Sequence, residues 1–165
     1  MNIQELTDEE VIKEIKEYFC VEEFVDERTF KKYGEKAWQF IDIRLLKTIL
    51  IIRINLDKGI TANNWKWGGI FDELGLRTNV CDIVSKKTKS DRLYLSAHLQ
   101  GKGLDFDVKG MTASKVRIWI KENAFLFPYK IRLEYKFARS GKEISWVHLD
   151  VYSFEGNEDV YLFNV

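Results

Sequence analysis

The sequence predicts an α+β domain in which helices come first and an antiparallel sheet follows. Three observations support this prediction: apolar residues at helical spacing early in the chain, alternating apolar and polar residues later, and no Pro/Gly-rich linker between the two parts. A chain of 165 residues can bury about two-thirds of its unfolded surface as one domain. We therefore expect a single domain over residues 1–165.

Three stretches have the features of helices. Residues 7–19 begin with Thr7 as an N-cap, followed by acidic residues in the first turn and apolar residues at helical spacing. Residues 42–56 are apolar on most sides, which predicts a largely buried helix. Residues 111–124 are amphipathic with helical spacing, whereas the polar residues 78–93 indicate a loop.

The later segments alternate between apolar and polar side chains, as strands with one buried face do. A short strand is also expected just after the buried helix. The expected strands cover residues 60–63, 104–109, 130–137, 144–152 and 159–165.

Parity along these strands brings several polar side chains to one face of the sheet. In residues 144–152 the apolar positions are odd-numbered, so Trp146, His148 and Asp150 point to the opposite side. By the same count, Asp105 and Glu134 point away from the apolar faces of their own strands. If these strands pair in one sheet, Asp105, Glu134 and His148 converge on its less apolar face.

Composition and charge argue against several functions. Lys plus Arg and Asp plus Glu are 26 each, so no strong field attracts nucleic acid or an anionic membrane, and the basic run 85–92 is expected to be a solvated loop. Cys20 and Cys81 show neither metal nor redox spacing, which indicates reduced thiols. The first residues are too charged for a signal peptide, and no apolar run could span a bilayer. We expect synthesis in the cytoplasm and no membrane insertion.

The chain has two histidines, and both lie in informative places. His98 precedes Asp105 by seven residues, with Gly101 and Gly103 between them to allow a sharp turn. His148 lies on the site-facing side of its strand. Two imidazoles and a carboxylate, with a fourth position for water, form the ligand set of a catalytic zinc site. The alternative is that both histidines are ordinary packed or surface residues.

These segments resemble the zinc peptidases of the D-alanyl-D-alanine carboxypeptidase, VanX and hedgehog type. The first signature of that family, S-x-H-x-x-G-x-A-x-D, stands here as Ser96, His98, Gly101, Gly103 and Asp105, with glycine in place of alanine. The second signature, W-x-H, stands as Trp146-Val147-His148. A third element, "SGYR" in the family, is similar to "LGLR" ending at Arg77. The resemblance covers about residues 35–153.

The resemblance implies roles for individual residues. A Zn²⁺ ion would be held by His98, Asp105 and His148. Arg77 would bind a substrate carboxylate or steady the developing oxyanion, because a guanidinium forks onto such oxygens. Ser96, Trp146 and Asp150 would stand behind the ligands and orient them.

The catalytic base is where this chain departs from part of the family. Some members place a glutamate three residues before the last histidine, but Ser145 stands there in this sequence. Glu134 has the parity of the site face and lies on the preceding strand, as in hedgehog-like members, so it is the preferred base. Glu143 is closer in sequence to His148 but points to the opposite face or lies in the turn, and Asp150 is the other alternative.

The implied fold is hedgehog/DD-peptidase-like, with an antiparallel sheet packed against helices and the zinc site on the open face of the sheet. The implied activity is zinc-dependent hydrolysis of a peptide bond in bacterial peptidoglycan, as a monomeric carboxypeptidase or an endolysin-like endopeptidase that a phage releases to the periplasm or cell wall. Two alternatives stay open: an inactive zinc-binding module on the same fold, such as a phage structural or binding component, and a structural domain without metal. The bond that is cleaved is left open too.

Overall fold

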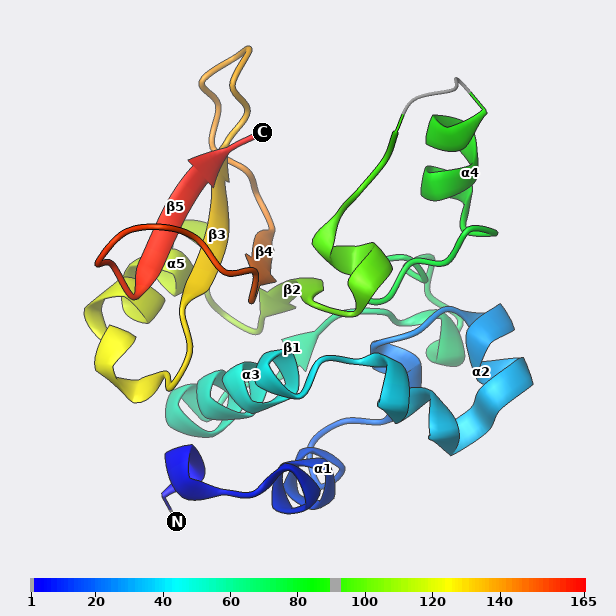
Figure 1. Cartoon of the computed structure of the whole chain (residues 1–165), viewed down its shortest axis with the longest axis horizontal. Coiled ribbons are helices and arrows are strands. Elements are labelled where there is room, and N and C mark those ends of the chain that lie inside the picture. Colours follow the sequence, from blue (N-terminus) through cyan, green and yellow to red (C-terminus); the bar gives the residue numbers. More distant parts are fainter. Residues whose placement is uncertain (1, 90–92) are drawn as a thin grey trace.

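The computed structural model describes residues 2–89 and 93–165, which form an α+β fold around a five-stranded mixed sheet (Figure 1). The α-helices of the described residues are α1 (Asp8–Ile15), α2 (Glu27–Tyr33), α3 (Ile43–Leu56), α4 (Asp82–Thr88) and α5 (Ala113–Glu122). The strands are β1 (Ile60–Thr61), β2 (Gly103–Val108), β3 (Ile131–Lys136), β4 (Val147–Asp150) and β5 (Val160–Asn164). No helix in these two ranges is long and apolar enough to cross a membrane.

The three expected helices are present as α1, α3 and α5. α1 starts after Thr7, whose hydroxyl accepts the N–H of Glu10 while the Glu10 carboxylate accepts the N–H of Thr7. α3 is buried from residue 45 to residue 52, as its apolar composition predicts. α5 contributes Val116 and Ile120 to the same hydrophobic core.

The prediction of a loop over residues 78–93 is wrong for α4, and residues 90–92 lie outside the described part of the chain. The Glu73 carboxylate accepts the N–H groups of Asp82 and Ile83 in the first turn of this helix. The cap therefore comes from a side chain nine residues earlier. Because the capping residue is not adjacent to the helix, the sequence has no local start signal there.

The sheet has the strand order β1-β2-β4-β3-β5. The pairs β1–β2, β2–β4 and β4–β3 are antiparallel, whereas β5 pairs parallel to β3. The prediction of an antiparallel sheet is therefore wrong for this edge. Both edges of β4 are already paired, with β2 and β3, so the chain that leaves β4 can join the sheet only at its margin. It turns back after β4 and lies along the far side of β3, which makes β5 parallel to β3.

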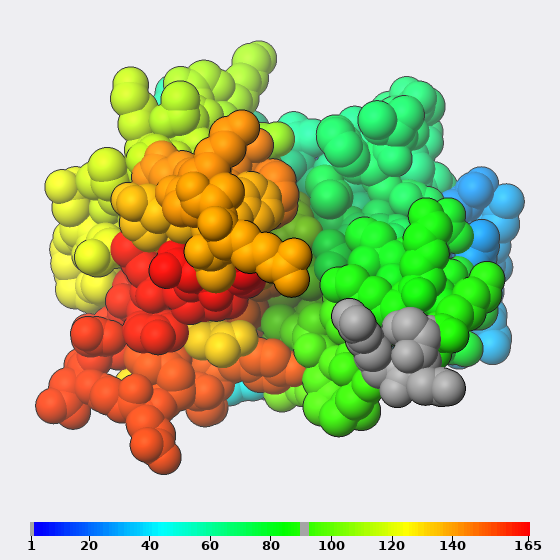
Figure 2. All heavy atoms as spheres, turned by 90° about the horizontal axis from the view of Figure 1, so that it is seen from above, coloured from blue at the N-terminus to red at the C-terminus, as the bar shows by residue number. Residues whose placement is uncertain are grey.

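The two faces of the sheet differ as the alternation predicts. One face is packed into the hydrophobic core and carries Leu104, Phe106, Leu133, Val147 and Leu149. The opposite face carries Asp105 on β2, Glu134 on β3 and His148 on β4, together with Arg132 and Asp150. Seen from above, a hollow separates the C-terminal strands from the segment that carries α4 (Figure 2). The polar face of the sheet forms the floor of this hollow.

Candidate metal centre

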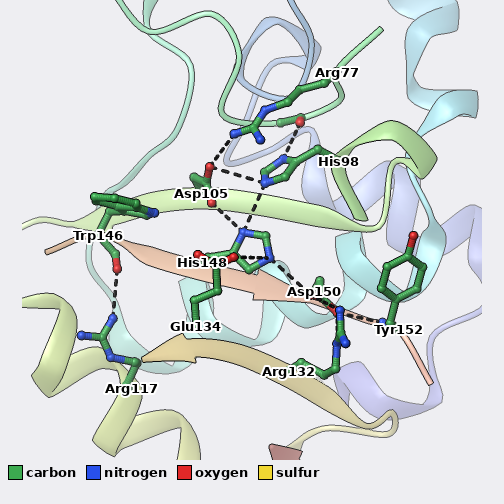
Figure 3. A network of polar contacts seen from close by, with 11 residues as sticks. Arg77, His98, Asp105, Arg117, Arg132, Glu134, Trp146, His148, Asp150 and Tyr152 are labelled. Carbon is green, nitrogen blue, oxygen red and sulfur yellow. Dashed lines mark hydrogen bonds and ion pairs between the residues drawn. The ribbon is translucent and has the colours of Figure 1, made fainter. Parts of the chain in front are cut away.

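Three side chains meet on the polar face of the sheet and could hold a metal ion: His98, Asp105 and His148 (Figure 3). Asp105 on β2 and His148 on β4 are direct partners in the antiparallel register. His98 lies in a short 3-10 helix, Ala97–Gln100, that leads into β2. One ligand atom from each residue lies within 4.8 Å of the others, and all three residues are buried. The convergence predicted from strand parity is therefore present.

Two glycines allow His98 to reach this position. Gly101 ends the 3-10 helix with φ of +64°, and a Cβ at this position would lie 2.0 Å from the backbone oxygen of Phe40. A Cβ on Gly103 would lie 2.9 Å from the Cβ of Ala97. A side chain at position 101 would push the end of the 3-10 helix away from the backbone of Phe40, and one at position 103 would push β2 away from Ala97. The glycine spacing therefore has a local physical reason.

The hydrogen bonds of the two imidazoles determine which nitrogens face the centre. Nδ1 of His98 lies 2.8 Å from the backbone oxygen of Gly75, and a carbonyl can only accept, so Nδ1 carries a proton and Nε2 keeps its lone pair. This Nε2 lies 3.2 Å from Nδ1 of His148 and 3.4 Å from Oδ2 of Asp105. Nδ1 of His148 in turn lies 2.7 Å from Oδ1 of Asp105. The centre is thus built from two nitrogens and one carboxylate.

This donor set fits a zinc ion. In a tetrahedral site with bonds of about 2 Å, neighbouring ligand atoms lie roughly 3.3 Å apart. The distances from Nε2 of His98 to Nδ1 of His148, 3.2 Å, and to Oδ2 of Asp105, 3.4 Å, are close to that spacing. The 2.7 Å hydrogen bond of His148 goes to the other oxygen of Asp105, Oδ1. Imidazole and carboxylate ligands are those of catalytic zinc sites.

Burial and hydrogen bonding shift the protonation of this group. Burial lowers the pKa of His148, but hydrogen bonds to Asp105 and Asp150 outweigh it and raise the pKa to about 10. Burial raises the pKa of Asp105, but the hydrogen bond from Nδ1 of His148 and the positive charge of that ring outweigh it and hold that pKa below its usual value. Burial lowers the pKa of His98. Without a cation at the centre, His148 is therefore the protonated imidazole at neutral pH.

Asp150 stands behind His148, as expected of a residue that orients a ligand. Its Oδ2 lies 3.2 Å from Nε2 of His148, on the side of the ring away from Asp105. The carboxylate also accepts two hydrogen bonds from Arg132 and one from the backbone N–H of Tyr152. Asp150 is 1% exposed, so these donors replace the water that an ionised carboxylate would otherwise need.

Arg77 lies against a candidate ligand. Its Nη2 donates to Oδ2 of Asp105 at 2.8 Å, and its Nε donates to the backbone oxygen of Glu73 at 2.7 Å. The guanidinium therefore holds the carboxylate of Asp105 from the side opposite His148. The Arg77 guanidinium also lines the cavity. It can donate to a bound molecule only through the N–H groups that are not already bonded to Asp105 and Glu73.

The three candidate bases occupy different places. Glu134 lines the cavity, and its Oε1 lies 4.0 Å from Nε2 of His148. Burial raises the pKa of Glu134, and the neighbouring carboxylates of Asp105 and Asp150 add to this. Asp150 is engaged with Arg132. Glu143 is exposed after the turn between β3 and β4, in an isolated antiparallel bridge with Lys136, and its carboxylate lies 3.5 Å from the Ser114 hydroxyl. Glu134 and Asp150 both line the cavity, and Glu134 is the one whose carboxylate is not held by Arg132.

Ser96 and Trp146 lie at the cavity wall but make no hydrogen bond to a candidate ligand among the described residues. The Ser96 hydroxyl is buried and has no partner in that part of the chain. The indole of Trp146 is half-exposed, and its backbone oxygen accepts a hydrogen bond from Arg117. The resemblance did not bring Arg132 into the site, although it lines the cavity. For Arg132 a signal existed, because its parity on β3 matches that of Glu134.

The cavity above the centre has a volume of about 420 Å³ and is open on one side. Its lining includes Tyr94, Leu95 and Ser96 from the segment before His98, and Trp146, Tyr152 and Phe163 from the C-terminal part of the chain. Comparison with known proteins gives no match among family models, curated proteins or solved structures. Fold and site thus define only a class: an α+β domain with a buried group of two histidines and one aspartate that could hold a metal ion.

Proposed function

We propose that this chain is a zinc-dependent peptidase that hydrolyses a peptide bond in bacterial peptidoglycan stem peptides. The observation that carries the proposal is the buried group of His98, Asp105 and His148, with Glu134 beside it on the floor of an open cavity. The spacing of the two zinc signatures supports the hedgehog/DD-peptidase-like family. A site on the open face of the sheet agrees with that family, whereas the parallel strand β5 is a feature that the resemblance does not account for.

Zinc bound by the two histidines and Asp105 would supply Lewis-acid chemistry, polarising the scissile carbonyl and activating water. Glu134 faces the same space and is half-buried, with a pKa raised by burial. A carboxylate in this position can accept a proton from the attacking water and deliver it to the leaving amine. Arg77 holds Asp105 in place and adds a positive charge next to the reacting carbonyl.

The cavity suits an extended peptide that carries carboxylates. It is open to solvent at the hollow of Figure 2, so part of a bound chain longer than the cavity can lie outside it. Its lining combines the cations Arg77, Lys87 and Arg132 and the carboxylates of Asp105, Glu134 and Asp150 with the apolar side chains of Leu95, Trp146 and Phe163. Stem peptides offer both free carboxylates and small apolar side chains to such a surface.

Glu134→Gln tests the proposal, with Glu143→Gln as the matched control. Zinc content is measured by mass spectrometry, and cleavage by chromatography of stem peptides released from purified peptidoglycan. We expect Glu134→Gln to keep about one zinc ion per chain and to lose at least about 100-fold in rate, because the base is lost and the ligands stay. Glu143→Gln should keep both properties, because Glu143 is exposed and does not line the cavity.

Three outcomes would contradict the proposal in different ways. Normal cleavage by Glu134→Gln would show that another group is the base. Zinc binding by the unaltered chain without cleavage of any stem peptide would favour the inactive metal-binding module. No zinc in the unaltered chain, even after zinc is supplied, would remove the basis of the peptidase assignment.

A further inference from the structure

Arg132 is held more firmly than a surface arginine. It lies on β3 directly opposite Asp150 on β4. Its Nε donates to Oδ1 of Asp150 at 2.8 Å, and its Nη2 donates to Oδ2 at 2.9 Å. Two parallel hydrogen bonds of this kind fix the orientation of both groups, not only their separation.

Two aromatic rings hold the guanidinium in place. Its central carbon lies 5.0 Å from the ring centroid of Tyr152 and 4.8 Å from that of Phe163. Tyr152 follows β4, and Phe163 is on β5, so the edge strand contributes to the environment of this arginine. Contacts between a guanidinium and aromatic faces add to the stability of such an arrangement.

The pair determines where the Asp150 carboxylate points. Oδ1 accepts from Arg132 and from the N–H of Tyr152, and Oδ2 accepts from Arg132 and faces Nε2 of His148 at 3.2 Å. If the carboxylate rotated, it would lose the two-pronged contact with Arg132, so Oδ2 stays directed at the imidazole. An acceptor at Nε2 places a proton there and leaves Nδ1, the nitrogen that faces Asp105 and His98, as the ligand atom.

We propose that Arg132, clamped by Tyr152 and Phe163, is a positioning residue of the metal centre that acts through Asp150 to fix the ring of His148 with Nδ1 toward the ion. The inference rests on the metal site of the proposed function and adds a residue to it. It also gives a role to the parallel strand β5, which carries Phe163. Removal of a partner that orients a metal-ligating histidine lowers metal affinity by about 10- to 100-fold.

The alternative is that the ion pair between Arg132 and Asp150 only stabilises the fold. A double-mutant cycle on zinc affinity separates the two, with Arg132→Met, Asp150→Asn and the double variant compared with the unaltered chain. The dissociation constant of Zn²⁺ is measured by competition with a chromophoric chelator, and the visible spectrum of bound Co²⁺ reports ligand geometry. Arg44→Met is the matched control, because Arg44 makes the same two-pronged contact with Asp42 and touches no candidate ligand.

We expect Arg132→Met to weaken zinc binding by about 10- to 100-fold and to change the Co²⁺ spectrum. Because Arg132 acts through Asp150, the double variant should bind zinc no more weakly than Asp150→Asn alone. Arg44→Met should leave zinc affinity unchanged. Where Arg132→Met does not fold, Arg132→Lys is measured instead, since it keeps the charge but cannot make the fork and should still bind zinc more weakly.

Zinc affinity within twofold of the unaltered chain in the folded Arg132 variants would overturn the inference and leave the metal site intact. Independent, multiplicative losses in the double variant would overturn it as well. Failure of the unaltered chain to bind Zn²⁺ or Co²⁺ would overturn both the inference and the proposed function.

Discussion

Zinc affinity should rise steeply with pH well beyond the range in which an ordinary histidine titrates. His148 must give up the proton on Nδ1 before that nitrogen can bind a metal ion. Since Asp105 and Asp150 outweigh burial and raise the pKa of His148 to about 10, the ring is protonated across the neutral range when no ion is bound. Each pH unit below that pKa lowers the apparent affinity about tenfold, which is about 1.4 kcal/mol. Between pH 6 and pH 8 the affinity should therefore rise roughly 100-fold.

The assay is competition with a chelator of known protonation constants at several pH values, together with calorimetry in buffers of different ionisation enthalpy. The calorimetry should show about one proton released for each zinc ion bound at pH 7. His98 adds little above pH 7, because burial lowers its pKa and the ring is already neutral. A zinc affinity that levels off above pH 7, with no proton release, would refute the reasoning, since it would mean that His148 titrates near the usual value of about 6.5.

Two further predictions concern stability. The folded-state pKa of His148 lies above its unfolded value, so the stabilisation by this group is complete below about pH 6.5 and is lost as the pH approaches 10. The metal-free protein should therefore unfold at a lower urea concentration at pH 9 than at pH 7. An unchanged urea midpoint would contradict this. Gly101→Ala should cost more free energy of unfolding than Gly141→Ala, which has a similar φ of +65° but open space around the new Cβ. The αL conformation costs each variant about 1–2 kcal/mol, and the 2.0 Å approach to Phe40 adds to that cost in Gly101→Ala. Equal losses of unfolding free energy in the two variants, measured by chemical unfolding, would show that the loop at Gly101 adapts.

Much of the candidate site could be predicted because strand periodicity is a strong local constraint. Side chains of equal parity share a face, so the polar face that carries Glu134 and His148 follows from the positions of apolar residues alone. The register between β2 and β4 then brings Asp105 opposite His148. Parity does not specify this register, but the glycines before β2 and the signature spacing were consistent with it.

The features that could not be predicted depend on contacts between distant segments. The sequence of β5 alternates like that of any edge strand, and its parallel pairing follows from which sheet edge was still open. The partner of Arg77 depends on how its loop folds onto β2, because the same guanidinium could have faced a substrate or a neighbouring carboxylate. The helix α4 depends on a cap from Glu73 in another loop. In each case the deciding contact is tertiary, and a single sequence does not encode it in local spacing.

The charges around the centre connect its two protonation states to the proposed chemistry. Counting Glu134 as ionised, the carboxylates of Asp105, Glu134 and Asp150 are balanced by Arg77, Arg132 and the protonated His148. Buried groups of this kind are stable only when their charges compensate. Exchange of the His148 proton for a divalent cation adds one positive charge to the balance. A site with this excess stabilises a neutral scissile carbonyl less than it stabilises the oxyanion formed when water attacks that carbonyl. The same network that keeps the metal-free centre neutral would therefore favour the transition state once zinc is bound.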